Sequence, residues 1–318
     1  MAKSKSFADD GWALWVDGND ISTVYLNEWL DPSGHSYTDF GLHIRGIQQS
    51  HMVNVYIPFP VEKNEIEDVS LRYQDEKLLY AMLNAACIID FKKNACTSEI
   101  AYNGKTADFV HISALGFDTK PVAEGTLLTI PLDILQPYLD NDEAFFRFRV
   151  PHKSLDRIFA PDINVATTLT RVRDLVTSLL VAERYGHSVR INEIRMLPSD
   201  IIHIGALHRQ KLKKAVVTIR IAADYEISDA NCYRIRRLEE DLYRSYAPPG
   251  YDCSNAIVYQ WNATRETHLN GHFNFYFNIS RNTISRTSML IYMILLLLVG
   301  AGGNALWSLI SFLFSQLL

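Results

Sequence analysis

TSMLIYMILLLLVGAGGNALWSLISFLFSQLL, residues 287–318, closes the chain and contains no charged residue. A helix needs about 20 apolar residues to cross a bilayer core of roughly 30 Å. A division at Gly302, Gly303 and Asn304 would leave two arms of about a dozen residues each, too short for two crossings. The pattern therefore predicts one C-terminal transmembrane helix, residues 281–318.

The charges beside this stretch predict its orientation. Arg281 and Arg286 precede the apolar residues and no basic residue follows them. Positive charges favour the cytoplasmic side of a membrane. The N-terminal residues MAKSKSFADDGW contain no apolar run like that of a signal peptide. We therefore expect a single-pass, tail-anchored membrane protein whose N-terminal region is cytoplasmic.

Small and polar residues recur along the apolar stretch at helical spacing. On a helical wheel they fall within about 80° of one another, and leucine and isoleucine occupy the other faces. The stripe consists of Gly300, Asn304, Ser308, Ser311 and Ser315. Two interpretations remain open: the stripe packs helix against helix, or it lines a water-filled pore between several copies. Both predict a homo-oligomer, and a pore requires four or more copies.

Residues 213–280 alternate in a way that predicts a β-α-β-β module. Residues 272–279, HFNFYFNI, have a period of two, and residues 256–261 and 215–222 are also strand-like. Residues 229–246 have apolar positions at helical spacing and end before Pro248. Residues 256–261 are expected to pair with 272–279 as an antiparallel hairpin.

The remaining chain divides into two parts. Residues 161–212 are predicted to be mainly helical, with a second helix after Pro198 capped by Ser199 or Asp200. Residues 1–160 are predicted to be a β-rich sensor or assembly domain with one helix near 75–84. Its expected strands are 42–47, 53–57, 87–91, 109–113, 127–132 and 144–150. The fold class predicted is an α+β cytosolic region followed by one transmembrane helix.

Sequence signatures of catalysis are absent. The chain has no G-x-S-x-G, Walker, G-x-G-x-x-G, H-E-x-x-H or kinase signature. Its four cysteines have no C-x-x-C spacing. We therefore expect no enzyme activity, no catalytic residue, no metal and no cofactor.

An anionic ligand is more plausible, because basic residues cluster. Between Arg171 and Lys214, nine basic residues stand against four acidic ones, although the whole chain has a formal charge of −5. In residues 145–149, FFRFR, the alternation places Phe145, Arg147 and Arg149 on one strand face, as in a base-stacking and phosphate-binding surface. The candidate binding residues are Phe145, Arg147, Arg149, Arg171, Arg173, Arg209, Lys211, Lys213, Lys214, Arg234 and Arg237. The alternatives are a solvated surface, with Arg234 and Arg237 paired to Glu240 and Asp241, or contact with lipid headgroups.

In layout, this chain resembles the membrane effectors of bacterial anti-phage defence, and Hailong-type effectors are the nearest match that we can suggest. The residues that carry the resemblance are the stripe from Gly300 to Ser315 and the basic region. The resemblance implies an oligomeric channel in the bacterial inner membrane, gated by a nucleotide or oligonucleotide and acting by membrane depolarisation. It also implies a nucleotidyltransferase partner, besides the lipid bilayer and further copies of the chain.

The working hypothesis is therefore a ligand-gated ion channel in antiviral defence. Phe273, Phe275, Phe277 and Arg286 would couple the cytosolic region to the helix. The alternative is a tail-anchored scaffold that recruits a protein partner and uses the helix as an anchor and dimer contact. A membrane-embedded hydrolase is a third possibility.

Overall fold

The computed structural model describes residues 11–18, 20–31, 36–83, 87–90, 96–102, 104–152, 160–161, 183–204, 207–208, 210–228, 232–264, 272–281 and 286–317. The chain forms two compact units. Unit 1 contains residues 1–160, 186–223 and 229–277, and unit 2 contains residues 161–185, 224–228 and 278–318. The chain passes from one unit into the other within three described strands, β12 (Ala160–Pro161), β13 (Glu183–Ile191) and β18 (Phe273–Arg281).

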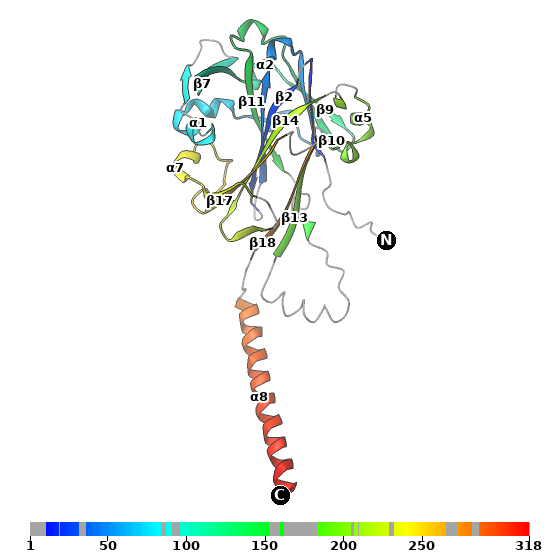
Figure 1. The fold of residues 1–318 in the computed structure, drawn as a ribbon, viewed down its shortest axis with the longest axis vertical. Coiled ribbons are helices and arrows are strands. Elements are labelled where there is room, and N and C mark those ends of the chain that lie inside the picture. The colour runs from blue at the N-terminus through cyan, green and yellow to red at the C-terminus, as the bar shows by residue number, and fades with distance from the viewer. Residues whose placement is uncertain are drawn as a thin grey trace. The chain divides into compact units, whose positions relative to one another are not determined.

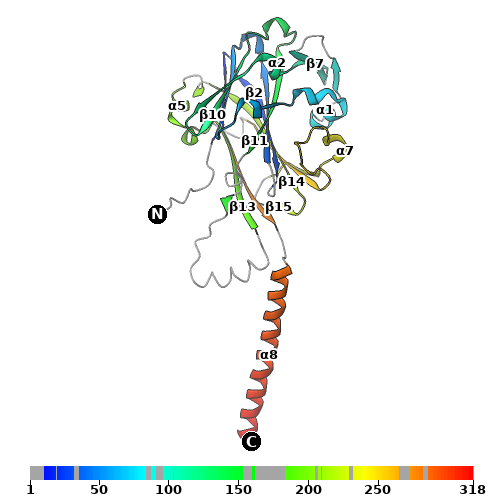
Figure 2. The same cartoon turned by 180° about the vertical axis from the view of Figure 1, so that it is seen from behind.

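Strands dominate the described part of the chain (Figures 1 and 2). The first are β1 (Ala13–Asp17), β2 (Ile21–Leu30), β3 (Ser36–Arg45), β4 (Met52–Ile57), β5 (Glu67–Asp68), β6 (Cys87–Asp90), β7 (Thr97–Tyr102), β8 (Lys105–Val110), β9 (Asp118–Val122), β10 (Gly125–Pro131), β11 (Glu143–His152) and β12 (Ala160–Pro161). After β13 come β14 (Leu212–Ala222), β15 (Tyr225–Ser228), β16 (Arg234–Arg237) and β17 (Ala256–Thr264), followed by β18.

The helices are short except for the last. The α-helices are α1 (Glu76–Leu83), α2 (Ile112–Leu115), α5 (Ser199–Ile202), α7 (Glu240–Tyr243) and α8 (Arg286–Leu317). The 3-10 helices are η1 (Ile47–Gln49), η2 (Lys63–Glu65), η3 (Ser70–Gln74), η4 (Gln136–Tyr138) and η5 (Ile194–Met196). α1 and α7 lie side by side in both views (Figures 1 and 2).

The principal sheet of unit 1 has ten strands. Their order is β16-β17-β14-β2-β3-β11-β8-β7-β6, and β5 pairs with β11. Most neighbours are antiparallel, but β14 runs parallel to β2 and β11 runs parallel to β8. β14 has the sequence LKKAVVTIRIA and is almost entirely buried, which suits a strand at the centre of a sheet with both faces covered.

Each face of this sheet packs against a different layer. On one face, Phe40 and Phe148 stack with ring centroids 5.5 Å apart, and Phe40 lies 4.8 Å from Trp12. Trp12 precedes β1, which belongs to a four-stranded antiparallel sheet of order β1-β4-β10-β9. The opposite face packs with η3, α1 and α7 through Trp29 and Tyr246. Residues on alternate sides of each strand therefore enter two separate cores.

A third sheet has the order β12-β13-β18-β15. Within unit 2, β15 pairs antiparallel with β18, Ile227 being opposite Ile279. The predicted hairpin of 256–261 with 272–279 is wrong. β17 pairs instead with β14 and β16, and β18 pairs with β15. β17 pairs with β14 over nine positions on one edge and with β16 on its other edge, so both of its edges are already occupied by other strands.

The helical parts of the predicted fold class are also corrected. Within the predicted helical segment 161–212, residues 183–191 form strand β13 and α5 is a four-residue helix, while 162–182 lie outside the described residues. The predicted helix 229–246 is replaced by strand β16 and the short helix α7. The apolar residue Ile235, which supported helical spacing, is 60% exposed. Pairing with β17 satisfies this backbone at the sheet edge, and such tertiary pairing overrides weak helical periodicity.

The membrane expectation requires a correction as well. In the stretches that the structure describes, no helix combines the length and the apolar character needed to span a bilayer. By this finding the prediction of a transmembrane helix over 281–318, of a membrane protein and of an inner-membrane location is wrong. α8 is helical from Arg286 to Leu317, but three glycines and an asparagine at 300–304 interrupt its apolar residues.

Candidate functional site

A cavity of about 280 Å³ opens on the α7-covered face of the ten-stranded sheet, entirely within unit 1. Strands β2, β3, β11, β14, β16 and β17 form its floor, and residues of η3, α1 and α7 form its walls. The volume is near the lower end of small-molecule pockets, which begin at roughly 300 Å³.

Strand register explains which side chains line the cavity. Arg147 of β11 lies opposite Gly41 of β3, which lies opposite Tyr25 of β2. Tyr25 in turn pairs with Val216 of β14, and Val216 pairs with Asn262 of β17. Directly opposed residues project from the same face of a sheet, and so do residues two positions along each strand. These residues form one row across the sheet. Four positions after Tyr25 on β2, a second row on the same face consists of Trp29, Arg220, Val258 and Arg236.

Five cationic side chains line the cavity, and no carboxylate is among its described lining residues. The cations are Arg147, Lys214, Arg220, Arg234 and Arg236. They alternate with aromatic side chains, namely Tyr25, Tyr73, Phe109, Phe145, Tyr233 and Tyr243. Positive charge beside aromatic faces is the combination that binds phosphates together with flat rings.

Arg220 is the most unusual of these cations. It is 3% exposed, and its guanidinium lies 4.3 Å from the Trp29 ring centroid and 5.5 Å from that of Tyr243. Its Nε and Nη1 have no hydrogen-bond partner among the described residues. A buried charge without a hydrogen-bonding partner is costly, so this guanidinium is suited to an anion that enters the cavity.

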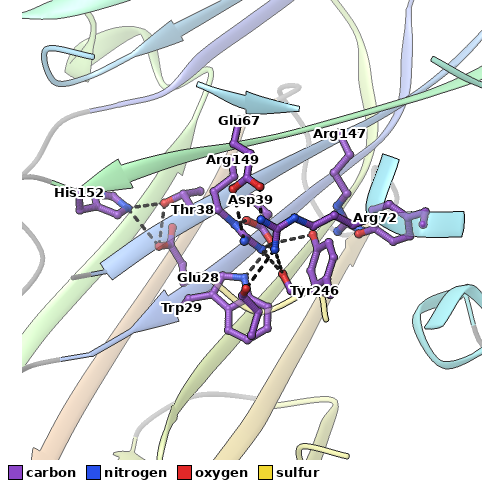
Figure 3. A network of polar contacts seen from close by, with 12 residues as sticks. Glu28, Trp29, Thr38, Asp39, Glu67, Arg72, Arg147, Arg149, His152 and Tyr246 are labelled. Atoms are coloured by element: carbon purple, nitrogen blue, oxygen red, sulfur yellow. Dashed lines mark hydrogen bonds and ion pairs between the residues drawn. The ribbon is translucent and has the colours of Figure 1, made fainter. Parts of the chain in front are cut away.

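Arg149, on the same face, has the opposite arrangement (Figure 3). Its Nε donates to Asp39 Oδ1 at 2.5 Å and its Nη2 donates to Asp39 Oδ2 at 3.0 Å. Trp29 Nε1 and the Tyr246 hydroxyl also donate to Oδ2, at 2.7 and 2.6 Å. Burial tends to raise the pKa of the Asp39 carboxyl, but Arg149 outweighs it and the pKa is lowered. Burial raises the pKa of Tyr246 to about 12. Arg149 therefore contributes to the structure and is already neutralised.

The chain segment after α7 is held to the sheet by two arginines. Arg149 Nη2 donates to the Tyr246 carbonyl at 2.9 Å. Arg72 Nη1 lies 3.2–3.4 Å from the carbonyl oxygens of residues 245–247, and its Nη2 donates to Glu67. Tyr243, a wall of the cavity, lies immediately before this segment, so these bonds restrain its position.

Arg147 and Gly41 form the opposite part of the floor. Arg147 Nη1 donates to the Tyr73 hydroxyl, and its guanidinium lies 5.2 Å from the Tyr73 ring centroid. Burial raises the pKa of the Tyr73 hydroxyl well above its ordinary value. A Cβ at Gly41 would lie 3.1 Å from Tyr25 Cβ and 3.4 Å from Arg147 Nε. Glycine therefore leaves room for both neighbouring side chains.

The structure separates the residues predicted to bind an anion. Phe145, Arg147, Lys214 and Arg234 line the cavity, and Arg149 is buried near it in the Asp39 ion pair. Lys211, Lys213 and Arg237 are exposed and do not line it. Arg171, Arg173 and Arg209 lie outside the described residues. The expected helical pairs of Arg234 and Arg237 are replaced by Arg236 with Glu239 and Arg244 with Glu240.

The other predicted residues lie away from the cavity. On α8, Gly300, Asn304, Ser308 and Ser311 are exposed, and the side chain of Ser315 is outside the description. On β18, Phe273 and Phe277 are buried and Phe275 is half-buried. Arg286 is the first residue of α8.

The sequence analysis missed Arg220, Arg236 and the tyrosine walls of the cavity. A signal for Arg220 was present, because it is the single charged residue within the strand-like stretch AVVTIRIA, 215–222. Arg236 was assigned to a helix. Tyr73 and Tyr243 are distant in sequence from the strands that they meet.

Among the described residues, no group of three or more histidine, cysteine or acidic side chains could hold a metal ion.

Comparisons with known proteins give no family. No family model matches the chain, and no curated protein matches it. Among solved structures it is similar to the Fcho1 Mu homology domain of Danio rerio with bound Eps15 peptide. The identity is 7%, with 86% of this chain and 82% of that chain covered and a TM-score of 0.15, a likeness too weak to bear on fold or function.

Proposed function

We propose that unit 1 is a binding domain for a nucleotide, and that the ligand occupies the cavity on the ten-stranded sheet. The observation that carries the proposal is the buried Arg220, whose Nε and Nη1 have no hydrogen-bond partner in the described chain and which lines a cavity free of carboxylates. A phosphate oxygen would satisfy these donors, and hydrogen bonds between charged groups are roughly twice as strong as neutral ones.

The aromatic side chains support a nucleotide over a simple inorganic anion. Tyr25, Tyr73 and Phe145 line the same cavity as the arginines. Bases stack on aromatic rings with about 1–3 kcal/mol per base. An inorganic anion would use the cations alone and leave the rings without a function.

The channel, antiviral and partner-recruiting functions expected from the sequence stay untested predictions. The proposal concerns ligand binding alone, because the residues that support it all line one cavity in the described part of unit 1.

The test is equilibrium binding of the purified full chain to thymidine 5′-monophosphate and to the 5′-phosphorylated dinucleotide pTpT. We expect binding of at least one probe, and Arg220→Gln should weaken it by about tenfold or more, the usual effect of removing a charged partner from a buried contact. Thymidine is the control for the need for phosphate.

Arg237→Ala is the matched control variant. Arg237 neighbours Arg236 on β16, yet it is exposed and does not line the cavity. Its substitution removes the same charge and should leave affinity within about twofold, since exposed charges contribute little. Two results would contradict the proposal. In the first, Arg237→Ala weakens binding as much as Arg220→Gln does. In the second, neither probe binds.

A further inference from the structure

The cavity has a closed end and an open end. At the closed end, the Arg220 guanidinium contacts the rings of Trp29, which is fully buried, and of Tyr243, which is 1% exposed. At the open end, Tyr233 is 72% exposed and Arg234 is also exposed, both beside or on the edge strand β16. This difference in exposure puts the entrance at Tyr233 and Arg234 and leaves Arg220 at the far end of the cavity.

The closed end limits which phosphate can reach Arg220. An internal phosphodiester continues as chain on both sides, whereas a terminal phosphate continues on one side only. Trp29 and Val258, which oppose Arg220 on the neighbouring strands, belong to a buried core cluster, so the described residues around Arg220 leave little room for chain to continue past it. Only the end of a ligand can occupy this position.

Charge favours the same orientation. Arg220 and Arg236 both face the Tyr243 ring, at 5.5 and 5.7 Å from its centroid, so two guanidinium groups converge at this end of the cavity. A terminal phosphate carries about 1.5 to 2 negative charges at pH 7, whereas a diester carries about one. Arg236 already pairs with Glu239 and donates Nη2 to the Tyr243 hydroxyl, so the principal cation for the ligand is Arg220, whose Nε and Nη1 have no hydrogen-bond partner among the described residues. The more negative terminal phosphate matches this cation better than a diester does.

Resting on the proposed nucleotide-binding function, we infer that the cavity recognises the terminal phosphate of a nucleotide or short oligonucleotide. The phosphate contacts Arg220 at the closed end, beside the ion pair of Arg236 with Glu239. The first base lies against the aromatic side chains, and any further nucleotides leave over β16 past Tyr233 and Arg234. The cavity volume of about 280 Å³ is enough for one nucleotide.

The test compares ligands of equal length that differ only in their ends. Binding of the full chain to TpT, pTpT and TpTp is measured by calorimetry, with thymidine monophosphate and inorganic phosphate as further arms. We expect at least one phosphorylated dinucleotide to bind about 30-fold more tightly than TpT, since loss of a charged partner at a buried site commonly has effects of this size or larger. Thymidine monophosphate should also bind more tightly than TpT if a single nucleotide is enough to fill the site. If a second nucleotide is needed at the rim, it should not.

Variants connect that preference to the closed end. Arg220→Gln should reduce the preference for the phosphorylated dinucleotide to about threefold or less, and Arg236→Ala should reduce it in the same direction. Arg237→Ala should preserve it. The thermal unfolding midpoint of each variant shows whether it is folded. If Arg220→Gln does not fold, Arg236→Ala, on the partly exposed edge strand, becomes the variant that tests terminal-phosphate recognition.

The outcomes separate this inference from the proposed function. Equal binding of TpT and the phosphorylated dinucleotides, weakened by Arg220→Gln, would preserve the nucleotide site and overturn terminal recognition. Inorganic phosphate binding as tightly as every nucleotide would overturn the placement of a base. Absence of binding in all arms would overturn both.

Discussion

Two buried arginines on one sheet face illustrate how the fold treats charge. Arg149 is 1% exposed and Arg220 is 3% exposed. Asp39 neutralises Arg149 with two hydrogen bonds, whereas Arg220 contacts aromatic rings and its Nε and Nη1 have no hydrogen-bond partner among the described residues. Cation–π contact compensates part of the desolvation of a guanidinium but supplies no hydrogen-bond acceptor in the ring plane. The first arginine therefore stabilises the fold, and the second is assigned to the ligand.

Substituting Asp39 tests whether the Arg149–Asp39 ion pair stabilises the fold. Asp39→Asn removes the principal charge opposite Arg149 and leaves the buried guanidinium with only Glu67 Oε2, 3.7 Å from Nη1, as an acidic partner among the described residues. Breaking a buried ion pair on one side commonly costs about 3–5 kcal/mol. The free energy of unfolding, measured by urea denaturation, should fall by about that amount. A loss below about 1 kcal/mol would show that Trp29 and Tyr246 hold the network without the ion pair.

At the scale of elements, strand alternation decides which basic residues belong to the cavity. On β14, Lys214 lines the cavity and Lys213 is exposed elsewhere. On β16, Arg234 and Arg236 line it and Arg237 does not. Successive side chains of a strand point to opposite faces. A basic cluster counted along the sequence therefore divides into two surfaces when its residues are in strands.

The pair on β14 gives a direct test of this division. Lys214→Ala should weaken binding of pTpT several-fold, by about 3- to 10-fold, because it removes a half-buried cation from the cavity. Lys213→Ala changes the chain composition identically and should leave affinity within about twofold. Binding titrations at one fixed salt concentration provide the measurement, because screening alters both values. Equal effects of the two variants would indicate binding through general charge rather than through the cavity.

At the scale of the whole molecule, a net charge of −5 coexists with a cavity whose charged lining residues, among those that the structure describes, are all cations. Acidic residues lie elsewhere on the chain, so the average composition conceals a local positive field. Such local fields determine which ligands approach a protein, whereas net charge mainly affects solubility.

Buried histidines should make the stability of the molecule depend on pH. Burial lowers the pKa of both His43 and His111 in the folded chain, so the unfolded chain binds more protons below about pH 6.5. The free energy of unfolding should therefore fall as the pH is lowered from 7 to 5. Urea denaturation at a series of pH values measures this slope.

Substitution of the histidines provides the control. His43→Gln and His111→Gln should each flatten the decline, because they remove a group that must stay neutral inside the fold. His111 lies 2.8 Å from both Ser70 Oγ and Ser98 Oγ, and glutamine retains hydrogen-bonding capacity there. Stability that rises on acidification would contradict the assignment of these groups.

Some features follow from local sequence. Strands occur at β4, β11, β14 and β18, where residues alternate or run as apolar β-branched segments, and α1 lies within the predicted helix 75–84. The placement of Phe145 and Arg147 on one strand face also follows from the period of two. These patterns depend on backbone geometry over a few residues, which the sequence specifies without reference to distant parts of the chain.

The tertiary structure alone decided the rest. Helical spacing in residues 229–246 was overridden at β16 by pairing with β17. The apolar composition of residues 287–318 suggested a span that the described helices do not supply. Arg220 became a ligand-binding candidate only because Trp29 and Tyr243, far away in the chain, meet on its two sides. The sequence by itself determined the alternation of side chains along each strand, since this follows from covalent geometry. Which strands became neighbours depended on the burial of distant surfaces together, and that choice placed cations and aromatic rings around one cavity.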